Sequence, residues 1–356
     1  MMKKICLAML VAMFCSGCGT SEELDAASSQ PRQDAFADNV TGGTNTPTPN
    51  SDTQDNGTQI SENSPIFHAM PANRESEDIS FSSDVFFASP FVSDGADIYM
   101  RLDRYANRSE AGLYVMAVGS DNFERVELDI PAEADIGNIA TDIYGTVYLV
   151  ITDRSNESHI IWCLDEDRQV AETLDISEYA SERRMPSEFA IDKDGTFYLY
   201  WAQNEELLAI DREGRLVHRF TAESLGAEYL QSIGVGRDGC LYISYVNATD
   251  SSVNIGRLDV ENGSIAKVYP DASFSNEENI VGIFRGTDTN LLLYSTNNGA
   301  LAYDTESGVV EYRVPISEIG FSAGVDFYRS FLPDGRLLVY TYDYEQSYLK
   351  YVPVGR

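Results

Sequence analysis

A short phrase, a tight turn followed by an apolar strand, returns six times after residue 80 and constrains the fold more than any other feature. Gly accepts the positive φ that such turns need and Asp bonds nearby backbone, so each copy predicts the tip of a β-hairpin. The third residues of these turns are Gly95, Gly145, Gly195, Gly239, Thr289 and Gly335, at steps of 44 to 50 residues. A period of this length predicts a repeat architecture.

A second hairpin follows the first within the units, as in residues 207–220 and 255–268. Two hairpins make four antiparallel strands, which is one blade of a β-propeller. We therefore expect an all-β, six-bladed propeller over residues 78–356. The last unit has room for only three strands, and the segment at 78–82 is placed to supply its outer one. Such pairing of the chain's two ends would close the ring and remove an exposed sheet edge.

The clearest copies of the repeated phrase, at residues 190–199 and 139–149, read apolar-x-Asp-x-x-Gly-x-apolar-Tyr-apolar or nearly so. This phrase resembles that of the six-bladed NHL, SMP-30-like and TolB-like propellers, and the likeness covers about three quarters of the chain. The resemblance implies the fold and says little about function, because propellers of one architecture carry many functions.

The N-terminus has the charge pattern and apolar run of a secretory signal, here residues 1–17. Its end, Cys15-Ser-Gly-Cys18, resembles a bacterial lipobox and implies a diacylglyceryl anchor on Cys18, although Cys15 stands where the family prefers Leu. We expect an extracytoplasmic protein anchored to the bacterial cell membrane. The alternatives are cleavage before Cys15, secretion without a lipid, and a retained anchor helix.

Residues 18–77 are rich in Ser, Thr, Asn, Asp, Gln and Pro, which predicts a lipid-anchored, disordered linker. A flexible coil of that length reaches on the order of 40 to 45 Å, enough to lift a domain off a membrane. A linker whose sequence is simply unconstrained explains the composition equally well.

The formal net charge of −32 argues against a nucleic-acid interface, because neutralising phosphates requires clustered Lys and Arg. Direct adhesion to anionic lipid is disfavoured for the same reason, so we expect membrane contact through the lipid anchor only. Cationic peptides or divalent ions are the partners that such a field favours.

No catalytic or metal-binding residue, and no cofactor, is predicted from motifs. We expect Cys163 and Cys240 to be buried, inert thiols, and the two Trp to pack in the core. His159 and His218 suit solvated or half-buried structural roles. The paired acids Asp192/Asp194 and Asp211/Glu213 resemble parts of calcium loops, but the later ligands are missing, so we assign them to turns.

The loops expected between blades, at 176–187, 222–230, 270–279 and 315–325, carry aromatic residues and two Arg in an otherwise acidic domain. Loops around a propeller's mouth are typical binding surfaces. The candidate ligand-binding residues are Tyr179, Arg183, Arg184, Tyr229, Phe274 and Phe321. The alternative is that these rings only fill the spaces between blades.

These observations favour a propeller that binds an extracellular glycan, a peptide or an envelope protein, and is more a binding or interaction module than an enzyme. The first alternative is a metal-dependent enzyme of the lactonase or lyase type. Its carboxylates and a divalent cation would lie in the central channel. The second is a scaffold subunit of an envelope complex.

Overall fold

The strands form six antiparallel sheets of four strands each, which confirms the expected four-stranded unit of an all-β propeller. The computed structural model describes residues 79–353, with gaps at 82–86, 103–110, 119, 121–122, 154, 181–184, 237, 270–279, 286–290, 297–298, 306, 308, 316–326, 332–335 and 343–346. The predicted signal at 1–17, Cys18 and the predicted linker at 18–77 lie outside the described residues.

Five sheets are built from strands consecutive in sequence, in hydrogen-bonded order. Their strands are β2 (Phe87–Ser93), β3 (Asp97–Leu102), β4 (Gly112–Ala117) and β5 (Phe123–Arg125); β6 (Ala134–Thr141), β7 (Val147–Asp153), β8 (Ser158–Leu164) and β9 (Val170–Asp175); β10 (Glu188–Ile191), β11 (Phe197–Trp201), β12 (Glu206–Ile210) and β13 (Leu216–Thr221); β14 (Ala227–Val235), β15 (Leu241–Asn247), β16 (Val253–Asp259) and β17 (Ser264–Tyr269); and β18 (Ile280–Arg285), β19 (Leu291–Thr296), β20 (Gly299–Asp304) and β21 (Val309–Pro315).

The sixth sheet joins the two ends of the described chain. It consists of β22 (Phe327–Phe331), β23 (Arg336–Tyr342) and β24 (Ser347–Pro353), with β1 (Ile79–Phe81) as its outer strand. β1 pairs antiparallel with β24, opposite residues 347–349. The expected closure of the last unit by the segment near residue 78 is therefore confirmed.

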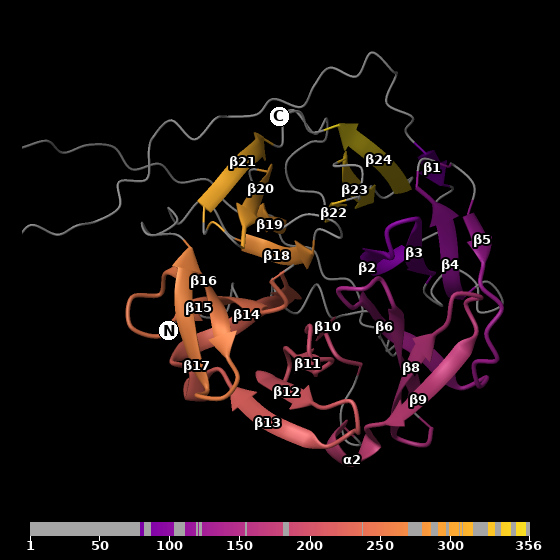
Figure 1. The fold of residues 1–356 in the computed structure, drawn as a ribbon, viewed down its shortest axis with the longest axis horizontal. Helices are drawn as coiled ribbons and strands as arrows, with labels where there is room; N and C mark the ends of the chain where they lie inside the picture. The colour runs from indigo at the N-terminus through magenta and orange to yellow at the C-terminus, as the bar shows by residue number, and fades with distance from the viewer. Residues whose placement is uncertain are drawn as a thin grey trace, which may run out of the picture. The chain divides into compact units, whose positions relative to one another are not determined.

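The first strand of each sheet contacts the first strands of the sheets before and after it (Figure 1). β2 contacts β6, β6 contacts β10, β10 contacts β14, β14 contacts β18, β18 contacts β22, and β22 contacts β2. We call these six strands the inner strands. Four of the inner strands, β10, β14, β18 and β22, begin within or just after the loops that the sequence marked as candidates.

The core lies between neighbouring sheets and follows the two-residue period of the strands. On β11, Tyr198 and Tyr200 join the buried cluster shared with the next sheet, whereas Leu199 and Trp201 join the cluster shared with the preceding one. Alternate side chains of a strand point to opposite faces, so a strand packed on both sides is apolar throughout. Trp162 also lies in a core cluster, and the packing role predicted for both Trp is confirmed.

Two of the expected connections contain more structure than loops. The segment 176–187 holds the short helix α2 (Ser177–Ala180). The segment 222–230 holds a 3-10 helix at Glu223–Leu225 and then the start of β14 at Ala227, so treating all of it as a loop was wrong. No helix in the described part of the chain is long and apolar enough to cross a membrane.

Candidate functional site

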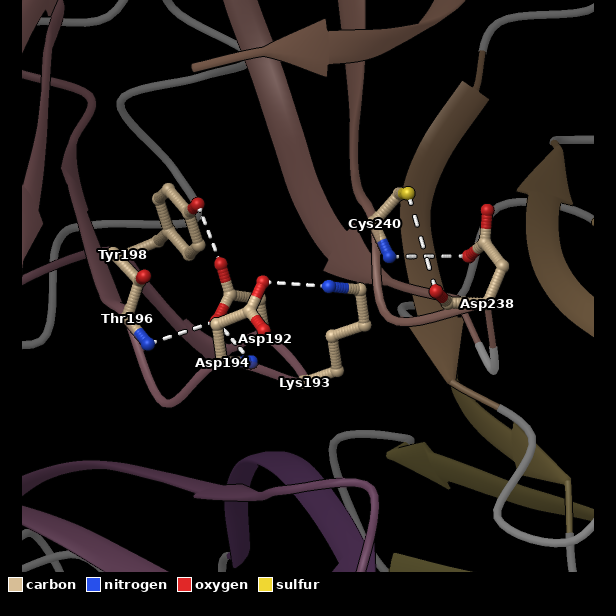
Figure 2. A network of polar contacts seen from close by, with 7 residues as sticks. All are labelled: Asp192, Lys193, Asp194, Thr196, Tyr198, Asp238 and Cys240. Atoms are coloured by element: carbon tan, nitrogen blue, oxygen red, sulfur yellow. Dashed lines mark hydrogen bonds and ion pairs between the residues drawn. The ribbon is translucent and has the colours of Figure 1, made fainter. Parts of the chain in front are cut away.

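The repeated turns use their carboxylates to hold the fold together (Figure 2). One Asp192 oxygen accepts the backbone N–H groups of Asp194 and Thr196 at 2.9 and 2.8 Å, and the other accepts the Tyr198 hydroxyl at 2.9 Å. Burial, together with the neighbouring Asp192 carboxylate, raises the pKa of Tyr198. The hydroxyl therefore stays protonated and donates to the turn.

The same Asp–Tyr bond occurs at three further turns in the described part of the chain. The pairs are Asp94–Tyr99 at 2.8 Å, Asp142–Tyr148 at 3.3 Å and Asp238–Tyr242 at 2.9 Å. The acid stands three residues before the turn's Gly in two cases and directly before it in the other two. An Asp at either of these two positions in the turn can thus accept the hydrogen bond from the Tyr hydroxyl.

The acids that resembled calcium loops act in turns, as predicted. Asp211 accepts the backbone N–H groups of Glu213 and Arg215 at 3.1 and 2.8 Å, and its second oxygen accepts Arg215 Nε at 2.7 Å. Asp192 is committed to its own turn as described above. Among the described residues, no three His, Cys, Asp or Glu side chains gather closely enough to hold a metal ion.

The predictions for the two cysteines and for His159 need correction, whereas the half-buried role predicted for His218 is confirmed. Cys163 lies on β8 next to the exposed outer strand β9, and Cys240 directly follows the Gly of a turn, so both are only half-buried. Burial still raises the pKa of both thiols. His159 is buried rather than solvated or half-buried, and its ring meets Trp201 edge-on at 6.5 Å. His218 is half-buried and stacks on Phe220 at 5.4 Å.

A row of polar side chains on three successive inner strands is the strongest candidate site. Asn138 on β6, Glu188 on β10 and Ser232 on β14 each stand seven residues before the Gly of the following turn. We call these three residues the inner-strand polar row. Asn138 and Ser232 are buried, whereas Glu188 remains half-buried. Equivalent positions in the repeat thus place polar groups side by side on contacting strands.

Each member of the row bonds across the boundary between sheets. Asn138 Nδ2 lies 3.3 and 3.2 Å from the carbonyl oxygens of Pro186 and Ser187, which lead into β10. The Ser232 hydroxyl donates to Glu188 Oε2 at 3.0 Å, and the Ile233 backbone N–H donates to the same oxygen. The row therefore joins β6 to β10 and β10 to β14.

Glu188 is the member of the row with unusual chemistry. Burial raises the pKa of its carboxyl to about 8, although the bonds from Ile233 and Ser232 oppose that rise. A carboxylic acid that stays neutral at pH 7 can donate a hydrogen bond as well as accept one. Strongly shifted groups of this kind are concentrated at functional sites, although structural networks also produce them.

The residues predicted from the sequence fall in three places. Tyr229 lies on β14, three residues before Ser232, and is half-buried. Tyr179 lies on α2 and packs against the core cluster between the second and third sheets, which favours the space-filling interpretation. Arg183, Arg184, Phe274 and Phe321 lie outside the described residues.

Sequence reasoning missed Glu188, although a signal was present. It opens the apolar run Glu188-Phe-Ala-Ile191, where a charged residue reads as the end of a loop. Aligning the repeats on their turns would have placed it level with Asn138 and Ser232. Three polar residues at one repeat position, on strands expected at the centre, would have marked the row.

No family model matches the chain, and neither does any curated protein sequence. Solved structures similar to it are β-propeller proteins. A catalytically inactive virginiamycin B lyase from Staphylococcus aureus with quinupristin is 14% identical, with 74% of this chain and 79% of the other covered and a TM-score of 0.45. YCF48 bound to D1 peptide is 11% identical, with coverages of 80% and 97% and a TM-score of 0.49.

A glucose dehydrogenase is 12% identical, with coverages of 75% and 100% and a TM-score of 0.42. Likeness at this level does not bear on ligand or activity, since one fold hosts many functions. The assignment of the fold rests on the pairing and cyclic contacts of the chain's own strands.

Proposed function

We propose that this chain is a lipid-anchored, extracytoplasmic protein whose six-bladed propeller binds a ligand or a partner protein. Cys18 carries the anchor, the segment 18–77 is the tether, and the starts of β10 and β14 form the binding site. The lipobox-like sequence and the composition of the linker support the anchor and the tether. The six sheets and the β1–β24 pairing support a closed propeller.

The observation that carries the binding site is that Tyr229 lies on β14, the strand that also holds Ser232 of the inner-strand polar row. Tyr229 is the third residue of β14, the strand that holds Ser232, and the Ser232 hydroxyl donates to Glu188 on the neighbouring strand. A half-buried aromatic residue on one strand, and on the neighbouring strand a carboxyl that can donate or accept, offer the apolar area and the polar anchor of small-molecule and peptide sites.

The chemistry of this site suits an extracellular glycan, a peptide or a loop of an envelope protein. Aromatic rings stack on sugar faces and pack on apolar side chains, while a neutral carboxyl hydrogen-bonds hydroxyl or amide groups. The net charge of −32 should speed encounter with cationic peptides and repel polyanions.

A second candidate is an enzyme of the lactonase or lyase type that uses a divalent cation. The raised pKa of Glu188 favours it, because general acids and bases work best with a pKa near the operating pH. This hypothesis requires a stoichiometric divalent ion in the purified protein and turnover that Glu188→Gln abolishes. Elemental analysis and a hydrolysis assay would decide it.

The binding proposal is tested by a thermal-shift screen against cell-wall fragments, oligosaccharides, cationic peptides and divalent metals. A ligand at a hundredfold its dissociation constant adds about 2.7 kcal/mol of stability, enough for a clear rise in melting temperature. Tyr229→Ala should weaken binding of the hit by about tenfold or more, as central aromatic contacts commonly do.

The matched control is Tyr144→Ala. Tyr144 is 74% exposed and follows the far end of an inner strand, in the turn after β6. It should leave the affinity of the hit unchanged. A hit that is lost with Tyr144→Ala but insensitive to Tyr229→Ala would refute this location of the site.

A further inference from the structure

The boundary between the third and fourth sheets contains a carboxyl group whose hydrogen bonds cross from one sheet to the other. Glu188 lies on the inner strand β10, and both partners of its Oε2 atom, the Ser232 hydroxyl and the Ile233 backbone N–H, lie on β14. Ser232 and Ile233 are buried. A charge formed at this position would lose solvation within a packed boundary.

A second bond holds the same part of β14. The Tyr200 hydroxyl on β11 donates to the Leu230 carbonyl at 2.6 Å. Glu188 and Tyr200 are opposite each other in the β10–β11 pairing, so the two side chains reach β14 together. The register of β14 against β15 shifts between Leu230 and Ser232. Both side chains thus hold the irregular segment of β14.

The strands packed against β10 hold no positive charge that would compensate an ionised Glu188. The titratable side chains on the three strands packed against β10 are Asp135 on β6, Tyr198 and Tyr200 on β11, and Glu228 and Tyr229 on β14. Tyr198 donates to Asp192, and Tyr200 to Leu230. Among the described residues, none supplies a positive charge, and burial is the largest influence on the pKa of Glu188.

We propose that Glu188 is a pH-dependent latch between the third and fourth sheets, closed while its carboxyl is protonated and loosened once it ionises. The protonated form keeps the acceptor oxygen that Ser232 and Ile233 need, without burying a charge. The ionised form is stabilised by opening the boundary to water. This device concerns the fold itself and stands or falls independently of any ligand.

The direction in which pH changes the stability follows from the raised pKa of Glu188. The pKa of Glu188 is raised in the folded protein, to about 8 from an ordinary value near 4.5. Its contribution to stability is fully present below the unfolded pKa and is lost as the pH rises towards the folded one. Between these values the folding equilibrium constant falls by about tenfold per pH unit through this group.

The test compares the unfolding equilibrium of the full chain and of Glu188→Gln between pH 5 and 9. Gln keeps the size and an acceptor oxygen but does not titrate. We expect the wild type to lose stability relative to Glu188→Gln by about tenfold in equilibrium constant per pH unit up to about pH 8. Glu172→Gln, at an exposed position of β9, should retain the wild-type pH profile. Parallel profiles for wild type and Glu188→Gln would overturn the proposal.

Two measurements on the wild type keep the test decisive if Glu188→Gln fails to fold. Infrared spectra of the folded protein should show a protonated carboxyl at pH 7 that disappears through about pH 8, and its absence at pH 7 would overturn the proposal.

Amide exchange, corrected for intrinsic rates, should accelerate at Ile233 above that pH. Ile139 is the control, since its N–H donates to an amide, Asn138 Oδ1, at 2.9 Å. Equal behaviour of the two amides would contradict a latch.

Discussion

The hydroxyl of Tyr198 and the carboxylate of Asp192 meet where both side chains are buried. The acid also closes the turn, so one residue satisfies two backbone N–H groups and a phenol. A buried acceptor that loses its donor pays for its lost hydration, and this asymmetry makes the pair a sensitive point in the repeat.

We expect Tyr198→Phe to lower the free energy of unfolding by about 1 to 2 kcal/mol, because it leaves one Asp192 oxygen without its donor. Chemical denaturation at pH 7 measures the loss. Tyr144→Phe, at a residue that is 74% exposed, should change stability by no more than about 0.5 kcal/mol. Equal effects of the two substitutions would show that the Asp–Tyr bond adds nothing.

At this scale, the sequence predicts those interactions whose partners are close in the chain. The turn role of Asp192 could be predicted because its partners lie two to six residues away. Glu188 could not be placed in the same way, since its partners lie 44 and 45 residues further along. Local pattern carries no information on such a contact unless the repeats are first aligned.

At the scale of elements, the glycines of the turns do more than allow a positive φ. Gly145 has φ +89°, and a Cβ there would lie 2.6 Å from the backbone oxygen of Asp94 in the preceding sheet. Gly226 has φ +70° and would meet nothing within 4 Å. The two glycines share the backbone requirement, but only Gly145 is also limited by a neighbouring sheet.

Gly226→Ala should therefore lower the free energy of unfolding by about 1 to 2 kcal/mol, because the left-handed conformation brings a Cβ too close to the following carbonyl oxygen. Gly145→Ala should cost about 1 to 3 kcal/mol more, because the Asp94 turn must also move. Thermal or urea unfolding of both variants checks the order. A smaller loss for Gly145→Ala than for Gly226→Ala would contradict the close approach of the two sheets.

Strands were predictable and their entrances were not. Apolar runs after each turn marked the second strands, because both faces of these strands are covered and almost every residue is apolar. The start of β14 at Ala227 was hidden, since a 3-10 helix ending at the left-handed Gly226 connects β13 to it within a few residues. Tyr229 was predicted as a loop residue for that reason, yet it lies on a strand.

At the scale of the whole molecule, the repeat count and the short last unit predicted that the two ends would share a sheet, as β1 and β24 do.

The anchor is a prediction from the N-terminal sequence alone. We expect a clickable fatty acid to label the protein in its bacterial host, and Cys18→Ala to abolish the label and release the protein from the membrane fraction. Labelling that persists in Cys18→Ala would refute the anchor position.

The starts of β10 and β14 are the proposed binding site. Hydrogen–deuterium exchange, with and without the ligand found in the screen, shows whether the ligand covers them. We predict slower amide exchange in residues 185–191 and 227–235, and no change in the turns at 142–146 and 192–196. Protection confined to those turns, with none at the starts of β10 and β14, would contradict the claim.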